Sequence, residues 1–196
     1  MLDKLGPFDY SKYQLSPEVE KLLRGRFKGD DAPEEGGPYK IQDTETGGFV
    51  IYEGKWWMQK RQGRGRQIWI GHGSGEPGTS PDLSHPGEIY GKYFRGTFFD
   101  DKIEGVGRMI YPDGTYYEGQ WKDNKRWGKG TIVFAQTSTR KSQLLDSFHQ
   151  EQESVLGTTQ SYTGDFVDDL YHGQGQEIWT SGAKYVGSYS KGLREG

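Results

Sequence analysis

The chain has no cysteine and no long apolar run. Without cysteine it can form neither a disulfide nor a thiolate nucleophile nor a cysteine-based zinc site. No uncharged apolar stretch approaches the roughly 18 residues that indicate a membrane-spanning helix. The first residues also lack the apolar segment of a signal peptide. We therefore expect a cytoplasmic protein that neither spans a membrane nor is exported by a signal peptide.

Aliphatic side chains are too scarce for an ordinary core. Leucine, isoleucine, valine and phenylalanine make up 36 of the 196 residues, a share that on its own would indicate disorder. The net charge of only -3 does not support disorder, and 13 tyrosines and 6 tryptophans add further rings. We expect a core of aromatic rings in one thin sheet, which needs neighbours to cover its faces.

The stretch from 94 to 135 repeats itself after 23 residues. A ring-glycine-ring triplet opens each copy, first as Phe94, Gly96 and Phe98, and a Gly-x-Gly pair follows. The opening triplet recurs at Tyr117, Gly119 and Trp121, at Tyr52, Gly54 and Trp56, at Tyr162, Gly164 and Phe166, and at Tyr185, Gly187 and Tyr189. Side chains two apart in a strand share a face, and glycine leaves room for a ring. Each copy therefore predicts a β-hairpin whose rings lie over the glycines of the adjacent strand.

Polar turns separate the predicted strands. Lys122-Asp123-Asn124-Lys125 fits a turn within a hairpin, and Pro112-Asp113-Gly114 and Ser181-Gly182 fit turns between hairpins. The pairs Asp100-Asp101 and Asp168-Asp169 recur at one repeat position. This recurrence predicts a turn in which aspartate bonds its own backbone, rather than an acid-base site.

The last copy stops at Gly196, where its second strand should begin. We therefore expect the strand around 185–189 to have no return strand within the chain. An open edge of this kind invites pairing with another chain, so self-association through the C-terminal edge is a further expectation.

This pattern resembles the MORN (membrane occupation and recognition nexus) repeat, whose consensus is close to YEGxWxxGxxxGxGxxxxxDG. The match covers about 52–196 and is most specific from Tyr117 to Phe134. The resemblance implies an all-β fold, an elongated single-layer antiparallel sheet of tandem β-hairpins. Proteins similar in this way serve in cilia and other cytoskeletal assemblies, including radial spoke heads, and in contacts at membranes.

Residues 1–50 are interpreted as an N-terminal arm, a short helix and a linker that precede the repeat sheet at 51–196. The arm is expected to dock Phe8, Tyr10 and Tyr13, and Ser16 to Gly25 has the cap, proline and glycine of a short helix. Residues 30–37 have the composition of a solvated linker. Within 38–50, a degenerate repeat would supply a strand at 38–41.

Two insertions interrupt the repeats, near 71–89 and at 136–160. The first is rich in glycine, serine and proline and predicts a flexible loop. The second favours a helical lid over one sheet face, with a disordered or partner-ordered loop as the alternative.

Eight rings are predicted to form a partner-binding face: Tyr52, Trp56, Phe94, Phe98, Tyr117, Trp121, Tyr162 and Phe166. Rings on a single-layer sheet are natural anchors for an extended segment or helix of another protein.

The leading hypothesis is a non-enzymatic scaffold or protein-protein interaction module in a cytoskeletal or ciliary type of assembly. No catalytic residues and no cofactor are predicted. Isolated histidines argue against a metal site, and the slightly negative charge argues against nucleic acid.

A basic cluster supports an alternative, a peripheral membrane module. Lys60, Arg61, Arg64 and Arg66 could meet anionic lipid head groups. The matching part of the fourth copy is acidic and neutral, so solvated turns explain these residues more simply. A second alternative is the targeting module of a larger enzyme, because similar repeats precede kinase or methyltransferase domains in some proteins.

Overall fold

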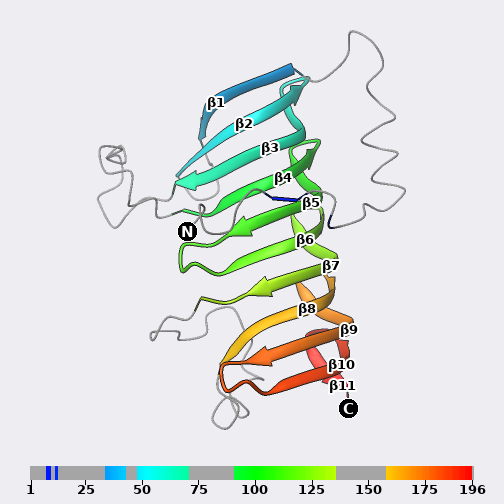
Figure 1. Ribbon diagram of the computed structural model, residues 1–196. Coiled ribbons are helices and arrows are strands. Elements are labelled where there is room, and N and C mark those ends of the chain that lie inside the picture. The colour runs from blue at the N-terminus through cyan, green and yellow to red at the C-terminus, as the bar shows by residue number, and fades with distance from the viewer. Residues whose placement is uncertain are drawn as a thin grey trace.

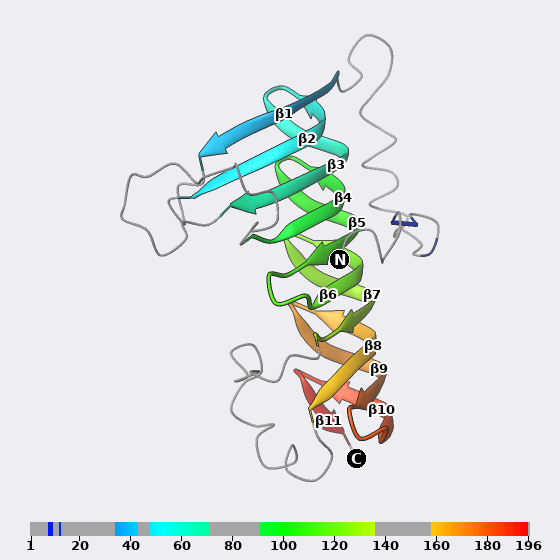
Figure 2. The same cartoon turned by 60° about the vertical axis from the view of Figure 1, so that its left-hand side comes forward.

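The computed structural model describes residues 8, 9, 12, 34–42, 48–70, 91–135 and 158–195. They form one antiparallel sheet of 11 strands whose spatial order is the chain order. The strands are β1 (Glu34–Gln42), β2 (Phe49–Trp57), β3 (Lys60–Ile70), β4 (Tyr93–Phe99), β5 (Lys102–Ile110), β6 (Tyr116–Lys122), β7 (Lys125–Val133), β8 (Thr159–Val167), β9 (Leu170–Trp179), β10 (Lys184–Ser190) and β11 (Leu193–Glu195). Figure 1 shows them as a strip one layer thick, and Figure 2 shows its twist. The predicted all-β, single-layer sheet of tandem hairpins is confirmed.

Each repeat is a hairpin closed by a two-residue turn in which both residues have positive φ. These turns are Met58-Gln59, Asp100-Asp101, Asp123-Asn124, Asp168-Asp169 and Lys191-Gly192. Turns with this backbone match the twist of the flanking strands, and aspartate and asparagine tolerate it better than most residues. Between β5 and β6, the Gly114 N–H donates to the Tyr111 carbonyl at 2.9 Å, so the predicted turn at Pro112-Asp113-Gly114 is also present.

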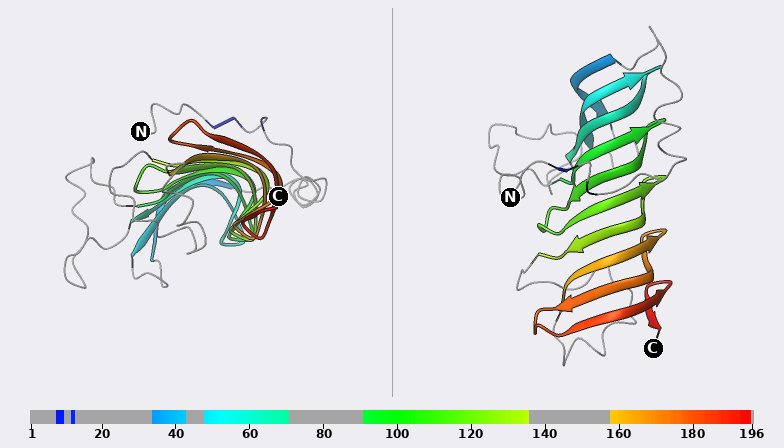
Figure 3. Two further views of the ribbon diagram at one scale, coloured as in Figure 1. Left: turned by 90° about the horizontal axis from the view of Figure 1, so that it is seen from below. Right: turned by 45° about the vertical axis from the view of Figure 1, so that its right-hand side comes forward.

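The two glycines of each Gly-x-Gly pair have different structural roles. The first, as in Gly128 with φ 61°, has a left-handed backbone, and Gly63, Gly105 and Gly173 share it. The strand register shifts beside these glycines. A bulge bends a strand, so one bulge in each of these hairpins curves the strip into the arc of Figure 3.

The second glycine provides space for a ring. A Cβ added at Gly130 would lie 2.5 Å from Cε2 of Tyr117, and one at Gly175 would lie 2.5 Å from Cε2 of Tyr162. Neither distance allows a methyl group without moving the ring. The predicted packing of rings over glycines is therefore confirmed.

The rings form a continuous core, the ring ladder, made of Trp56, Tyr52, Phe98, Phe94, Trp121, Tyr117, Phe166, Tyr162, Tyr189 and Tyr185. Successive rings meet edge to face with centroids 5.1–5.5 Å apart. The contacts between Tyr52 and Phe98 and between Tyr117 and Phe166 cross from one repeat to the next. Such pairs contribute about 0.5–1.5 kcal/mol beyond their buried area. The ladder therefore couples each repeat to its neighbours.

The N-terminal end of the sheet begins earlier than predicted. The strand expected at 38–41 is present, but β1 starts at Glu34 and pairs with β2 from Glu34 opposite Trp56 to Gln42 opposite Phe49. The linker interpretation of 30–37 is therefore wrong for 34–37, and the sheet starts before residue 51. An edge strand tolerates proline and charge, which is why composition alone indicated a linker.

The C-terminal end also differs from the prediction. Leu193–Glu195 forms β11 and pairs with Ser188, Tyr189 and Ser190, so the expected absence of a return strand is wrong. The prediction began the return strand at the glycine that corresponds to Gly128. Return strands begin earlier in the structure, since β7 begins at Lys125, three residues before Gly128. Self-association through this edge stays a prediction.

Several predictions lie outside the described residues. These are the helix from Ser16 to Gly25, the docking of Tyr10 and Tyr13, the loop at 71–89 and the helix at 136–160, except that Thr159 and Gln160 belong to β8.

Candidate functional site

The eight rings predicted to bind a partner lie in the core of the strip. Six of them have no exposed surface, namely Tyr52, Phe94, Phe98, Tyr117, Tyr162 and Phe166. Trp121 is 5% exposed, and only Trp56 is half-buried. These rings therefore belong to the core and do not form an exposed face, because they cover one another and the glycines. Binding of a partner through them stays a prediction.

The tyrosines that open the repeats donate their hydroxyl groups to the backbone. Tyr52 donates to the Lys55 carbonyl at 3.0 Å, and Tyr117 donates to the Gln120 carbonyl at 2.9 Å. Burial raises the pKa of the Tyr162 hydroxyl above its usual value, so this group stays neutral at physiological pH. Packing and hydrogen bonding therefore account for these tyrosines, and no catalytic role is needed to explain them.

The predicted basic cluster is divided between two parts of the sheet. Lys60 pairs with Asp100, and Arg61 pairs with Asp101, both at the margin that carries the hairpin turns. Arg64 and Arg66 are exposed, and Arg66 donates from Nε to Glu53 at 2.8 Å. Lipid binding by these four residues stays a prediction, but carboxylates already pair with Lys60, Arg61 and Arg66.

The turns of neighbouring hairpins are joined by an arrangement that we call the turn clasp. Arg126 donates from its backbone N–H and from Nε to Asp169 Oδ1 at 3.0 and 2.9 Å. Its guanidinium also donates to the Asp169 carbonyl at 2.9 Å, and the Asp169 N–H donates back to the Arg126 carbonyl at 3.1 Å. Arg61 and Asp101 repeat this set.

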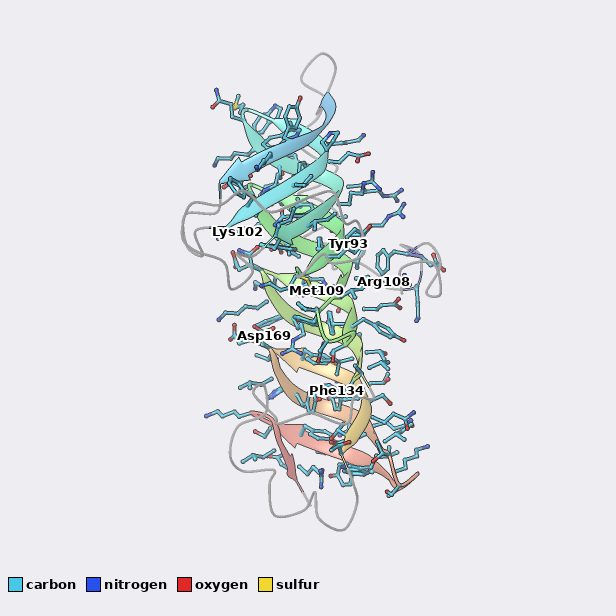
Figure 4. The ribbon with its side chains drawn as sticks, turned by 90° about the vertical axis from the view of Figure 1, so that its left-hand side faces the viewer. Tyr93, Lys102, Arg108, Met109, Phe134 and Asp169 are labelled. Atoms are coloured by element: carbon cyan, nitrogen blue, oxygen red, sulfur yellow. The ribbon has the colours of Figure 1, made fainter. Side chains whose placement is uncertain are left out.

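The turn clasp corrects the interpretation of the aspartate pairs. Asp101 and Asp169 adopt the turn backbone as predicted, but their carboxylates bond the preceding hairpin rather than their own backbone. Lys102 and Asp169 mark this margin of the sheet in Figure 4. Sequence reasoning missed the clasp because its partners lie 40 or 43 residues apart.

The outer face of the sheet, opposite the ring ladder, carries a row of apolar side chains in direct register. Ile51 pairs with Ile68, Ile68 with Tyr93 and Tyr93 with Ile110. The pairing continues through the following strands. The outer apolar row is Ile51, Ile68, Tyr93, Ile110, Tyr116, Val133 and Ile178, with Ser161 between the last two. All but Ile110 are half-buried. One sequence feature could have predicted this row: an apolar residue lies three positions after the second glycine of each return strand.

A second row on the outer face carries charge toward the N-terminal end of the sheet. The charged row consists of Glu53, Arg66, Arg95, Arg108 and Glu118, which are paired in that order on β2 to β6. The row continues with uncharged residues Thr131, Thr163, Gln176 and Val186. Arg108 and Glu118 form a buried ion pair at the β5–β6 end of the charged row, each 8% exposed.

Two residues of the N-terminal segment, Phe8 and Lys12, contact the outer face at this ion pair. Phe8 is 6% exposed, and the Arg108 guanidinium lies 5.9 Å from its ring centroid. Lys12 Nζ lies 3.3 Å from Glu118 Oε2. Figure 3 places this segment outside the arc, and Figure 4 shows Arg108 pointing toward it. The expected docking of Phe8 is therefore confirmed, and the outer face can bury an aromatic side chain.

The described part of the chain shows neither a cluster of metal ligands nor a membrane-spanning helix. Within it, no three histidine, cysteine, aspartate or glutamate side chains are grouped so that they could hold a metal ion. None of its segments is a helix long and apolar enough to cross a membrane. The outer face, with its two rows, is the surface that calls for a functional explanation.

Comparison with known families identifies the repeats. The family model described as the MORN repeat matches residues 94–116, 117–139, 162–184 and 185–196. No curated protein matches the chain. The hairpin of β2 and β3 lies outside these matches but has the same turn, bulge and ring over glycine. MORN repeats are in general modules that interact with proteins or membranes. With four matched repeats over 94–196 and a sheet of tandem hairpins, the chain belongs to the MORN repeat family.

Proposed function

We propose that this chain is a non-enzymatic scaffold that binds other proteins through the outer face of its sheet. The outer apolar row carries the proposal, because its side chains take part neither in the ring ladder nor in the hairpin turns. Apolar side chains that stay half-exposed in a row along one face of a sheet are typical of an interaction surface. An assembly of cytoskeletal or ciliary type, on the cytoplasmic side of membranes, fits the MORN proteins that the chain resembles.

The chain's own N-terminal segment supports this use of the outer face. Phe8 becomes almost fully buried beside Arg108, and Lys12 adds an ion pair with Glu118. An aromatic anchor with a charged contact at its edge is a common way for a segment to bind a protein surface. A partner segment on the rest of the row would use the same contacts.

The test compares two glutamate substitutions on the outer face. Val133→Glu places a charge in the outer apolar row, whereas Thr163→Glu places the same charge at an exposed position in the neighbouring row. Tagged full-length variants are purified from cells under native conditions, and co-purifying proteins are quantified by mass spectrometry. We expect Thr163→Glu to recover the partners of the wild type and Val133→Glu to lose them. Equal recovery by both variants, at equal thermal stability, would contradict the proposal.

A second candidate is a peripheral membrane module that binds anionic head groups. The observation that favours it is the exposure of Arg64, Arg66 and Arg95 on adjacent strands. Flotation with phosphatidylserine vesicles tests it, comparing the double variant Arg64→Glu, Arg66→Glu with Lys184→Glu at the other end of the sheet. Salt-sensitive flotation that only the double variant loses would favour lipid. No flotation of the wild type would reject it.

A further inference from the structure

Three arginines lie opposite one another on neighbouring strands of the outer face. Arg66 on β3 pairs with Arg95 on β4, and Arg95 pairs with Arg108 on β5. Side chains at paired positions have Cβ atoms about 5 Å apart, and like charges there destabilise a sheet. Such a row needs anionic groups around it.

Two of the three arginines have a carboxylate within the chain. Glu53 accepts a hydrogen bond from Arg66, and Glu118 accepts one from the buried Arg108. Arg95, between them, is exposed, and within the described residues it makes no ion pair. Three arginines against two glutamates leave a net positive charge in the charged row, and Lys12 adds another beside Glu118, which it shares with Arg108. Arg95 is the arginine of the row that has no carboxylate among the described residues.

Apolar side chains flank Arg95 on the same face. Tyr93 stands two residues before it on β4, and Ile68 pairs with Tyr93 from β3. Both are half-buried. One strand further on, Phe8 shows how a ring fits this surface, since it is buried with its face toward the Arg108 guanidinium. A guanidinium over an aromatic face is favourable, more so when water is excluded.

We propose that Arg95, with Ile68 and Tyr93, binds an extended acidic segment of a partner protein that carries an aromatic side chain next to its carboxylate. The inference rests on the proposed function and names the chemistry of the partner. A carboxylate matches the charge of Arg95, which no carboxylate of the described residues pairs with, and a guanidinium can hold it through two parallel hydrogen bonds. The aromatic side chain covers Ile68 and Tyr93, as Phe8 covers the surface beside Arg108.

The charged row favours a carboxylate over a phosphate group or a bilayer. Glu53 and Glu118 bracket the arginines and repel a multiply charged anion. Attraction to an anionic membrane grows with each added basic residue, and this row supplies one uncompensated charge.

The experiment selects peptides from a random displayed library on the full-length protein. Arg95→Ala tests the site, and Lys184→Ala is the matched control, because it removes the same charge from an exposed outer-face position on β10. We expect the wild type to enrich peptides in which aspartate or glutamate adjoins an aromatic residue. Synthesised and titrated, these peptides should bind Lys184→Ala as they bind the wild type and bind Arg95→Ala at least about tenfold more weakly. Replacing their acidic residues by amides should weaken them similarly.

Several outcomes would overturn the inference. They are no enrichment of acidic aromatic peptides, equal weakening by Arg95→Ala and Lys184→Ala, or full binding of the amide peptides. Arg95-dependent binding of phosphatidylserine vesicles in place of peptides would assign the site to lipid. If Val133→Glu still loses the cellular partners, the proposed function stands and only the partner chemistry assigned to Arg95 fails.

Discussion

Adding one methyl group at Gly130 should destabilise the strip strongly. The new Cβ would lie 2.5 Å from Cε2 and 2.6 Å from Cζ of Tyr117. Tyr117 is fully buried, and its ring meets Trp121 and Phe166 with centroids 5.1 Å away on both sides. The ring therefore cannot move without displacing two others. Overpacking of this kind costs about 1–3 kcal/mol.

A smaller effect in the unfolded state opposes this cost. Replacing glycine by alanine restricts the unfolded chain and stabilises the fold by about 0.4–1 kcal/mol. We therefore expect Gly130→Ala to lower the free energy of unfolding by about 1.3 kcal/mol net of that gain. For a chain of this size the thermal midpoint should fall by roughly 3–5 °C. Circular dichroism during heating and urea titration measure both quantities.

Two further variants show whether the ring is the cause. Lys125→Ala removes an exposed side chain at a hairpin turn and should cost at most about 0.5 kcal/mol. In a Tyr117→Leu background the smaller side chain leaves room, so Gly130→Ala should cost less than half of its effect in the wild type. If Gly130→Ala costs the same in both backgrounds, or no more than Lys125→Ala, ring packing over glycine does not limit this position.

Three other predictions follow from hydrogen bonds and pKa shifts. Trp121→Phe should destabilise the chain by about 1 kcal/mol more than Trp56→Phe. The reason is that Trp121 Nε1 donates to the Gly107 carbonyl at 3.1 Å, whereas the buried Trp56 Nε1 has no acceptor in the described structure. Equal losses in urea unfolding would contradict this. Asp169→Ala should cost about 1–3 kcal/mol more than Asp168→Ala, since both residues have positive φ but only Asp169 closes the turn clasp. A difference near zero would show that the clasp adds no stability. Burial, together with the Glu177 carboxylate, raises the pKa of Tyr189 above the usual 10.0. The unfolded chain therefore loses this proton first, and stability falls above about pH 10 by up to about 1.4 kcal/mol per pH unit for this tyrosine. Tyr189→Phe should make the alkaline decline shallower, and an unchanged slope in unfolding measured from pH 9 to 11 would refute the assignment.

The repeated hairpin could be predicted because its demands recur at fixed positions in the sequence. Each return strand needs one glycine for a left-handed backbone and another for space beneath a ring, so Gly128 and Gly130 recur as a pair in every complete copy. The rings over these glycines are equally constrained. Both features are local, and a period of 23 residues exposes them.

The binding surface could not be predicted in the same way. Outer-row residues share a register position but not a residue type, since Ile178 pairs with Ser161 on one side and Lys184 on the other. The charged row becomes visible only when the strands are aligned, because Arg66 and Arg108 lie on either side of an insertion. The sequence interpretation placed the binding face at the aromatic residues, but these rings recur because they form the buried core.

Photo-crosslinking in cells tests most directly whether the outer face binds other proteins. A photoreactive phenylalanine analogue replaces Tyr93 or Tyr116 of the outer apolar row in the full-length chain, and Trp127, a half-buried ring near the hairpin-turn margin, is the control position. If the outer apolar row is the binding surface, illumination should give protein adducts of defined mass from Tyr93 and Tyr116 and none from Trp127. Adducts from Trp127 alone, or in equal amounts from all three positions, would contradict the assignment.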